Sequence, residues 1–222
     1  LLKREMEISQ FVENYAPKSI TVPVIELTQI EGKPCVVMQY RNNGLFLSEL
    51  MEKYRKKLSF ADKAEIGIRV LDSLSTLHAF KAEDQDTGVL HLDIHPGNIF
   101  MESADPENHE YGTAKFIDFA SSEILKGGAP VNPVLRSQTP GYSAPEILEE
   151  EKELLSAATD LYSVGAVLYK LFIGEKVKSD GNDFSGDCFG DSRIISEALR
   201  TFLRCSLEYN PKYRYRDALS MK

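Results

Sequence analysis

The stretch His91-Leu92-Asp93-Ile94-His95-Pro96-Gly97-Asn98 places an acid, an amide and two imidazoles within eight residues. Pro96-Gly97 is typical of a loop, and the apolar residues from Ile99 to Met101 that follow it predict a short strand. We therefore expect Asp93 and Asn98 to lie on a tight loop at the mouth of a strand.

A second acid follows Asn98 by twenty residues, in the run Phe116-Ile117-Asp118-Phe119. Two short strands joined by the polar residues 103–108 would bring Asp118 beside Asn98. A carboxylate and an amide oxygen at one point are hard ligands, suited to Mg2+ that is also held by substrate phosphates. Asp93 is then left to orient a hydroxyl nucleophile.

Composition limits the class of protein. The 222 residues are 42% hydrophobic, enough for the core of one domain, and the net charge of -8 without a basic tract argues against nucleic-acid binding. Three widely spaced cysteines indicate a reducing compartment and no disulfide framework or zinc site. No apolar run is long enough to span a membrane and no signal peptide is visible, so we expect a cytoplasmic protein, or the cytoplasmic domain of a larger one. Because the chain begins with Leu1 and not Met, we expect a fragment.

Periodic apolar residues predict helices over 1–15, 45–56, 60–78, 157–172 and around 194–207, and strands over 22–27 and 34–40. Ser59 and Asp62 predict a capping box at the start of one helix, and Gly174 predicts the end of another. His78, at the end of an apolar stripe, is expected to be a packed core residue without a chemical role. The polar stretches 121–137 and 178–192 are expected to be loops. This mixture of elements indicates an α+β protein.

The set Asp93, Asn98 and Asp118 resembles the catalytic-loop and metal-binding residues of the protein kinase superfamily. The run Thr139-Pro140-Gly141-Tyr142-Ser143-Ala144-Pro145-Glu146 is similar to the end of a kinase activation segment, with its Ala-Pro-Glu motif. Asp160-Leu161-Tyr162-Ser163-Val164-Gly165 resembles the αF signature. The landmarks come in family order, and the resemblance covers nearly the whole chain.

The resemblance implies a protein kinase-like α+β fold. Residues 1–40 would form a partial N-lobe, with the αC helix, two strands and the start of the hinge, and residues 41–222 would form a mostly helical C-lobe. The C-lobe would contain the catalytic loop 91–98 and the activation segment 118–146. The glycine-rich loop and the strand lysine of the family have no counterpart in this chain, so half of the phosphate clamp is missing from it.

The resemblance also implies roles for the residues of the loop. Asp93 would orient the acceptor hydroxyl and take up its proton, and His95, which stands where the family usually has lysine, would donate a hydrogen bond to the γ-phosphate. Asn98 would act beside them in catalysis and would hold Mg2+ together with Asp118. Thr139 would be the P+1 threonine that contacts the catalytic aspartate, which favours serine/threonine specificity.

ATP would bind near the hinge, and the residues expected at the nucleotide are Met38, Gln39, Tyr40, Phe100 and Glu5, the last at the position of the αC glutamate. The residues expected to be structural are His91, Phe119, Glu146, Asp160 and Arg214. By resemblance, Asp160 would bond to the backbone of the catalytic loop, and Glu146 would form a buried ion pair with Arg214.

Three departures from the family pattern leave alternatives open: Leu92 replaces the usual arginine, His95 the lysine, and Ala120 the glycine after Asp118-Phe119. The combination most resembles a bacterial eukaryotic-like serine/threonine protein kinase acting on ATP and a protein substrate. A histidine before Pro-Gly-Asn also occurs in small-molecule kinases of the aminoglycoside and choline type, which generally lack the Ala-Pro-Glu segment. A pseudokinase-type binding or regulatory module is the other alternative.

Overall fold

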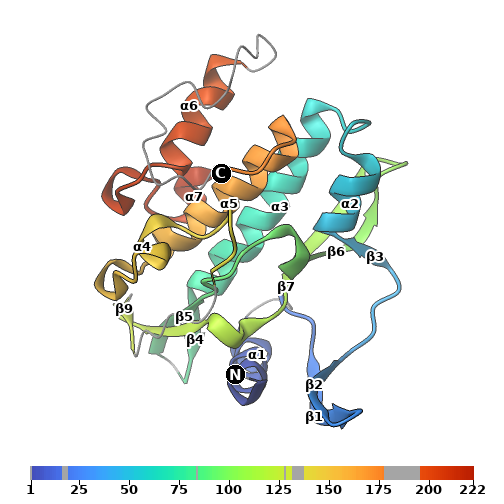
Figure 1. The fold of residues 1–222 in the computed structure, drawn as a ribbon, viewed down its shortest axis with the longest axis vertical. Helices are drawn as coiled ribbons and strands as arrows, with labels where there is room; N and C mark the ends of the chain where they lie inside the picture. The colour runs from blue at the N-terminus through green and yellow to red at the C-terminus, as the bar shows by residue number, and fades with distance from the viewer. Residues whose placement is uncertain (1, 17–19, 84, 128, 132–137, 178–195) are drawn as a thin grey trace.

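The computed structural model describes residues 2–16, 20–83, 85–127, 129–131, 138–177 and 196–222 (Figure 1). Its helices are α1 (Leu2–Tyr15), α2 (Leu47–Tyr54), α3 (Phe60–His78), α4 (Pro145–Leu148), α5 (Ala157–Ile173), α6 (Glu197–Ser206) and α7 (Ala218–Met221), with 3-10 turns η1 (Pro96–Asn98), η2 (Phe119–Ser121), η3 (Lys152–Leu154) and η4 (Pro211–Tyr213). Its strands are β1 (Val24–Ile30), β2 (Lys33–Met38), β3 (Gly44–Phe46), β4 (Phe80–Ala82), β5 (Gln85–Leu90), β6 (Ile99–Asp105), β7 (Glu110–Phe116), β8 (Glu123–Lys126) and β9 (Ala129–Pro130). The mixture confirms the α+β class.

Helices α3 and α5 pack against each other at the centre of the molecule (Figure 1). Helix α3 begins at the predicted capping box, in which the Ser59 backbone N–H donates to the Asp62 carboxylate at 2.8 Å and the Asp62 N–H donates back to the Ser59 hydroxyl at 3.1 Å. Helix α5 ends at Gly174, whose φ of +102° is readily adopted only by glycine. Both predicted ends are therefore confirmed.

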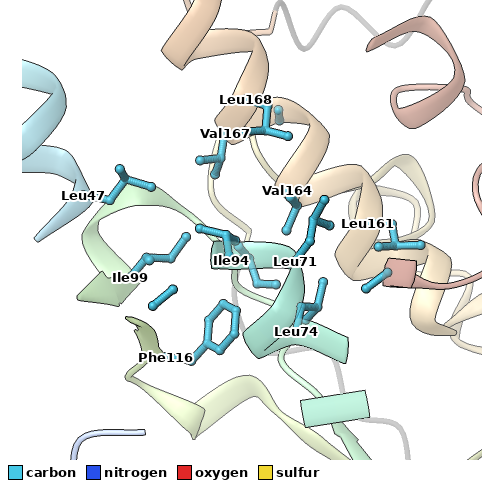
Figure 2. Close-up of a cluster of buried hydrophobic side chains, with 14 of the residues drawn as sticks. Leu47, Leu71, Leu74, Ile94, Ile99, Phe116, Leu161, Val164, Val167 and Leu168 are labelled. Carbon is cyan, nitrogen blue, oxygen red and sulfur yellow. The ribbon is translucent and has the colours of Figure 1, made fainter. Parts of the chain in front are cut away.

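The core between these helices and the strands is apolar and closed to solvent. Figure 2 shows side chains of α3 and α5 meeting those of the catalytic-loop region and of β7. The labelled members are Leu47, Leu71, Leu74, Ile94, Ile99, Phe116, Leu161, Val164, Val167 and Leu168. Helix α5 is buried on nearly every side, which explains its apolar composition without a bilayer. Within the described ranges, no helix has both the length and the apolar character needed to cross a membrane.

The strands form three antiparallel sheets, in the orders β1-β2, β3-β6-β7 and β4-β5-β8-β9. In the second sheet Ile99 pairs with Phe116, and the Ile117 N–H donates to the Asn98 carbonyl at 3.1 Å. The two strands predicted around the turn at 103–108 are thus confirmed. Their register places Asp118 one residue beyond the backbone bond to Asn98.

The structure differs from the sequence predictions in two places. The helix predicted from residue 45 begins at Leu47, because Gly44–Phe46 pair with β6. The predicted loop 121–137 contains β8 and β9, and β8 pairs with the unpredicted strand β5. Strands β8 and β9 are short, and the pairing of β8 with β5 joins residues distant in sequence, so local periodicity gives little sign of them. The predicted loop at 178–192 lies outside the described residues.

Glu146 and Arg214 form the ion pair that the sequence analysis expected. The two guanidinium nitrogens donate to the two carboxylate oxygens at 2.7 and 2.8 Å, and both side chains are almost fully buried. Arg214 also donates to backbone carbonyls of Glu208, Tyr209 and Ala158. The pair joins α4 to the chain after α6, with its charges balanced and its hydrogen bonds made.

Removal of either charge should destabilise the protein strongly. We expect Glu146→Gln, which leaves Arg214 buried without its carboxylate, to lower the free energy of unfolding by about 3–5 kcal/mol. Urea unfolding measures this, with Glu153→Gln as the matched control, because Glu153 is exposed in the nearby turn η3. The control should change the value by less than about 0.5 kcal/mol. Equal losses in both variants would contradict the prediction.

Candidate active site

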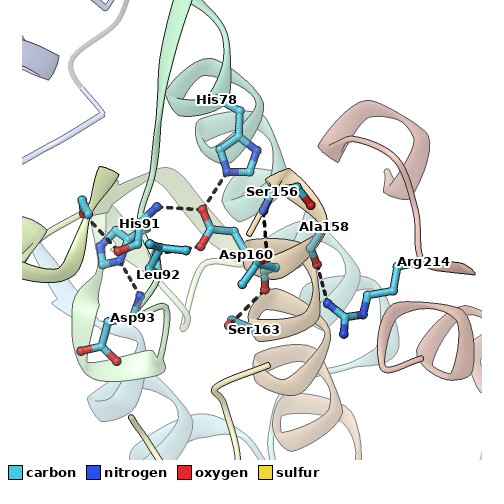
Figure 3. Close-up of polar contacts among 11 residues, drawn as sticks. His78, His91, Leu92, Asp93, Ser156, Ala158, Asp160, Ser163 and Arg214 are labelled. Carbon is cyan, nitrogen blue, oxygen red and sulfur yellow. Dashed lines mark hydrogen bonds and ion pairs between the residues drawn. The ribbon is translucent and has the colours of Figure 1, made fainter. Parts of the chain in front are cut away.

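The loop 91–98 is held by one buried carboxylate. Asp160, on α5, accepts hydrogen bonds at 2.8 Å from the backbone N–H groups of His91 and Leu92 and from the Nε2 of His78 (Figure 3). Asp160 is fully buried, and Leu92 has a left-handed φ of +62°. Such a conformation is strained for leucine, so the two N–H bonds to Asp160 stabilise a turn that the chain alone would disfavour.

His78 was expected to be a packed core residue, and its ring is indeed largely buried. The structure adds a polar contact, because its Nε2 lies against the Asp160 carboxylate at the end of α3. The partner is eighty-two residues away in sequence, and no local pattern around His78 points to it.

His91 connects the loop to the segment that carries Asp118. Its Nδ1 accepts from the Asp93 N–H at 3.3 Å, so in the neutral ring the proton lies on Nε2, which donates to the Ile117 carbonyl at 3.0 Å. The ring lies 5.5 Å from that of Phe116 and 5.2 Å from that of Phe119, between centroids. His91 and Phe119 therefore fix the positions of the two acidic loops relative to each other.

Asp93 is held from two sides. The Thr139 hydroxyl donates to its Oδ1 at 2.6 Å, and the Asn98 side-chain amide donates to its backbone carbonyl at 3.0 Å. Thr139 is itself positioned by a hydrogen bond from its N–H to the Ser143 hydroxyl at 2.7 Å. Asp93, Asn98 and Thr139, all selected from the sequence, therefore form one cluster. Among the described residues no donor contacts the second carboxylate oxygen of Asp93, so this oxygen can accept from another hydroxyl.

Asp118 has an open carboxylate. Its backbone is left-handed, at φ +62°, and its Oδ1 accepts a long hydrogen bond of 3.4 Å from the Ala120 N–H. Within the described ranges, no three His, Cys, Asp or Glu side chains gather closely enough to hold a metal by themselves. Asp118 and Asn98 fit a cation that takes its remaining oxygen ligands from water and phosphate, as Mg2+ does.

Glu5 adds a second carboxyl near Asp118. It is 7% exposed on the inner face of α1, which packs against η2. Burial, and then the charge of Asp118, raise the pKa of Glu5 to about 7. In the part of the chain that the structure describes, no side chain forms an ion pair with it. Glu5 would therefore be stabilised by a cation placed between it and Asp118.

Arg4 and Glu123 were not predicted, and they attach α1 to the segment after Asp118. The Arg4 guanidinium lies 2.7 Å from the Glu123 carboxylate and also donates to the Ser122 carbonyl at 3.0 Å. The Ser122 hydroxyl donates to the His91 carbonyl at 3.0 Å. A helix and a strand more than a hundred residues apart in sequence are thus joined beside Asp118, a contact for which the sequence holds no local signal.

His95 is half-buried beside Asp93. Its Nδ1 accepts from the Gly97 N–H at 3.1 Å, which leaves the proton of the neutral ring on Nε2. Burial lowers the pKa of His95, against an opposing effect of the Asp93 charge. The ring is therefore a neutral hydrogen-bond donor at physiological pH, with its centroid 6.2 Å from that of Tyr142.

The residues predicted at the nucleotide are less closely associated. Met38 ends β2 and is half-buried, whereas Gln39 and Tyr40 are exposed, Tyr40 to 86%. Phe100 lies on β6 with its ring 5.4 Å from that of Phe46. The hydrogen bonds and ring contacts of the described residues do not join Phe100 to Met38–Tyr40, so a single nucleotide site including both groups stays a prediction.

The raised pKa of Glu5 predicts a pH dependence of stability. Between its ordinary value of 4.5 and about 7, the folded chain holds a proton that the unfolded chain releases. This contribution is fully present below about pH 4.5 and is lost as the pH rises through about 7. In buffer without Mg2+, Glu5→Gln should therefore stabilise the chain of residues 1–222 near pH 8 by about 1–3 kcal/mol, with little effect near pH 4.5.

Urea unfolding across this pH range measures the effect, with Glu7→Gln, an exposed position on the same helix, as the control. A Glu5→Gln variant whose effect on the free energy of unfolding is the same at both ends of the range would contradict the assignment.

Comparison with known proteins agrees with this geometry. The protein kinase domain family matches residues 2–219. Serine/threonine-protein kinase 17A of Oryctolagus cuniculus is 27% identical over 149 residues, which are 67% of this chain and 34% of that protein. Serine/threonine-protein kinase PknK of Mycobacterium tuberculosis is 29% identical over 144 residues, 64% of this chain and 11% of that protein. A probable LRR receptor-like serine/threonine-protein kinase of Arabidopsis thaliana is 27% identical over 154 residues, 69% of this chain and 15% of that protein.

The aligned segments span about a third or less of the length of these relatives. The family match, in contrast, includes both acidic loops, the Thr139 segment and the buried Glu146–Arg214 pair. With its helices and antiparallel sheets arranged around those elements, the chain belongs to the protein kinase family.

Proposed function

We propose that this chain is the catalytic region of a serine/threonine protein kinase that transfers the γ-phosphoryl group of ATP to a protein hydroxyl. The observation that carries the proposal is the 2.6 Å hydrogen bond from the Thr139 hydroxyl to Asp93. It holds one carboxylate oxygen and leaves the other beside the cluster for an acceptor hydroxyl. Asp93 would orient this acceptor and take up its proton as the bond to phosphorus forms.

Asn98 and Asp118 would hold Mg2+, which when bound neutralises charge on the transferring phosphoryl group. Neutral His95 would donate its Nε2 proton in a hydrogen bond to a phosphate oxygen, where a charged lysine would be a stronger donor. Since little covalent chemistry is asked of the protein, positioning and charge stabilisation would supply most of the catalysis.

In this proposal residues 1–40 belong to the N-lobe and 41–222 to the C-lobe of the kinase. Met38, Gln39, Tyr40 and Phe100 would contact the nucleotide, and Glu5 would face its phosphates. The substrate would be a serine or threonine of a cytoplasmic protein. Both the lobe boundary and the nucleotide contacts follow from the family resemblance and the position of Glu5 beside Asp118.

A pseudokinase-type regulatory module is the second candidate. The observation in its favour is that Glu5 has no cationic partner among the described residues, whereas active kinases pair the equivalent glutamate with a strand lysine. The two candidates differ in turnover: a kinase transfers phosphate from Mg-ATP, and a module of this type binds a partner without doing so.

Substitution of the two acids tests the kinase proposal in the full-length protein. Asp118→Asn should abolish Mg-ATP-dependent phosphoryl transfer, because it removes a metal ligand. Asp93→Asn should lower kcat by about a hundred-fold or more, the usual contribution of a general base, while leaving the Kd for ATP largely unchanged. Transfer of 32P to a protein substrate and ATP titration measure the two quantities.

Asp86→Asn, at an exposed position of β5, is the matched control and should behave as wild type. Wild-type turnover in both Asp93→Asn and Asp118→Asn would refute the site assignment. A wild-type protein that binds a partner but has no turnover would favour the regulatory module.

A further prediction concerns regulation. Leu92, where the family usually has arginine, is 2% exposed and packs in an apolar cluster with Leu90, Leu125, Ile147 and Leu155. Ser121 and Ser122 are buried, and the neighbouring Glu123 already forms an ion pair with Arg4. Apolar packing of Leu92 and the ion pair of Glu123 would thus order the segment after Asp118, as a phosphate bound by arginines does in kinases that phosphorylation activates. We expect that phosphorylation of Ser121, Ser122 or Ser137, the last outside the described residues, is not the activating step.

Activity of the full-length protein should change less than ten-fold after exhaustive phosphatase treatment and after Ser→Ala substitution at the three positions. A loss of ten-fold or more, about 1.4 kcal/mol in the barrier, that is restored by rephosphorylation of one of these serines would disprove the expectation.

A further inference from the structure

Four cationic side chains gather at the C-terminal end of α5. Arg55 follows α2, and its guanidinium lies so close to Gly174 that a Cβ there would be 2.5–2.7 Å from three of its atoms. Lys63, at the start of α3, has its Nζ 5.9 Å from the centre of the Phe172 ring. Lys170 lies in the last turn of α5, and Lys176 follows Gly174 by two residues.

A chain of contacts connects these cations to Asp93, the proposed catalytic base. The Lys176 Nζ lies 5.4 Å from the centre of the Tyr142 ring, and the His95 ring lies 6.2 Å from it. The Tyr142 N–H donates to the carbonyl of Thr139, whose hydroxyl bonds to Asp93. Lys176 is therefore linked to Asp93 through Tyr142 and Thr139.

Stabilisation of the fold explains only some of the four cations. A positive charge at a helix C-terminus is modestly favourable, and a cation–π contact adds a similar stabilisation. These effects explain one or two such residues. Four like charges repel one another: burial and the charge of Arg55 lower the pKa of Lys63, and burial with the charges of Lys176 and Arg55 lowers that of Lys170.

Acidic neighbours do not compensate for this repulsion in the described parts of the chain, where none of the four forms an ion pair with a carboxylate. The chain as a whole is acidic, with a net charge of -8. Such a chain repels anions in general, and a local positive cluster makes one place on it attractive to them.

We propose that Arg55, Lys63, Lys170 and Lys176 bind acidic side chains of the protein substrate, so that the enzyme selects serines and threonines flanked by aspartate or glutamate. The inference rests on the proposed kinase function and names its substrate class. Carboxylates beside the acceptor relieve the repulsion among the cations, whereas a basic substrate meets four like charges. The cluster therefore attracts acidic substrates and repels basic ones. The small size of the cluster and its place beside the acceptor site favour a short acidic peptide over a long polyanion.

Binding without ATP tests the inference separately from catalysis. Three labelled peptides share one central serine and differ in their flanking residues, which are glutamate, alanine or lysine. Fluorescence anisotropy with the full-length protein should give a Kd about ten-fold lower for the glutamate peptide than for the alanine peptide, with the lysine peptide weakest. The difference should shrink as salt is added.

In the double variant Arg55→Gln/Lys170→Gln, the ratio of the Kd for the alanine peptide to that for the glutamate peptide should fall below about three-fold. The reason is that two of the four positive charges that favour the glutamate peptide are lost. Lys81→Gln/Lys212→Gln removes the same net charge at exposed positions away from the cluster and should keep the full difference. Thermal unfolding checks that each variant is folded. Lys176→Gln changes an exposed side chain and gives the test a second variant if the double variant does not fold.

The stretch 178–195, outside the described residues, includes four aspartates, so the titrations are repeated with these changed to asparagine. The preference for the glutamate peptide over the alanine peptide should be at least as large in this variant. Equal binding of the glutamate and alanine peptides, a preference that survives in both cluster variants, or tighter binding of a mixed-sequence single-stranded RNA than of the glutamate peptide would overturn the inference. A clear peptide preference without any phosphoryl transfer would instead count against the proposed function and leave the binding cluster standing.

Discussion

The fold of the candidate site depends on the buried carboxylate of Asp160. A charge inside the protein is unfavourable unless hydrogen bonds replace its hydration, and here three N–H donors at 2.8 Å do so. Two of these donors are backbone groups of His91 and Leu92, so the same bonds that stabilise the charge also fix the loop that carries Asp93. Because Asp160 lies in α5, a helix whose residues are mostly buried, the loop is attached to the apolar core (Figures 2 and 3).

Polar and apolar side chains connect this loop to the segment that carries Asp118. His91 donates to the Ile117 carbonyl and lies tilted against the Phe119 ring, while the Ser122 hydroxyl donates to the His91 carbonyl. Leu92 brings an apolar side chain where the family usually has a charged one, and it packs in a buried cluster with Leu125 of β8 and Ile147 of α4. Helix α1 is then fixed through Arg4 and Glu123.

Charge is distributed unevenly over this framework. Buried charges away from the site are matched, as Glu146 and Arg214 are. Near Asp93 the charges are not matched among the described residues. Glu5 and Asp118 are neighbouring carboxyls without a cationic partner between them, which disfavours the charged form of Glu5, and Arg55, Lys63, Lys170 and Lys176 are four cations without a carboxylate partner. Repulsion of this kind opposes folding, so it is most readily understood where bound ligands of opposite charge offset it. A metal with phosphates at the first place and carboxylates of a substrate at the second would do so.

The sequence by itself determined the class of fold, the hairpin that follows Asn98, the capping box at Ser59 and the helix end at Gly174, because each depends on neighbouring residues. Motif order added the family, and with it the pairing of Glu146 with Arg214, which no spacing rule predicts. Only the tertiary structure decided the strands β4, β5, β8 and β9, the bond from His78 to Asp160, the attachment of Arg4 to Glu123, and the gathering of four cations at the end of α5. The pairing of β5 with β8 and the contacts of His78 and Arg4 join residues far apart in the chain, while β4 and β9 are too short to leave a periodic pattern. The free energy that fixes these contacts comes from burial and charge in three dimensions, which local sequence patterns do not contain.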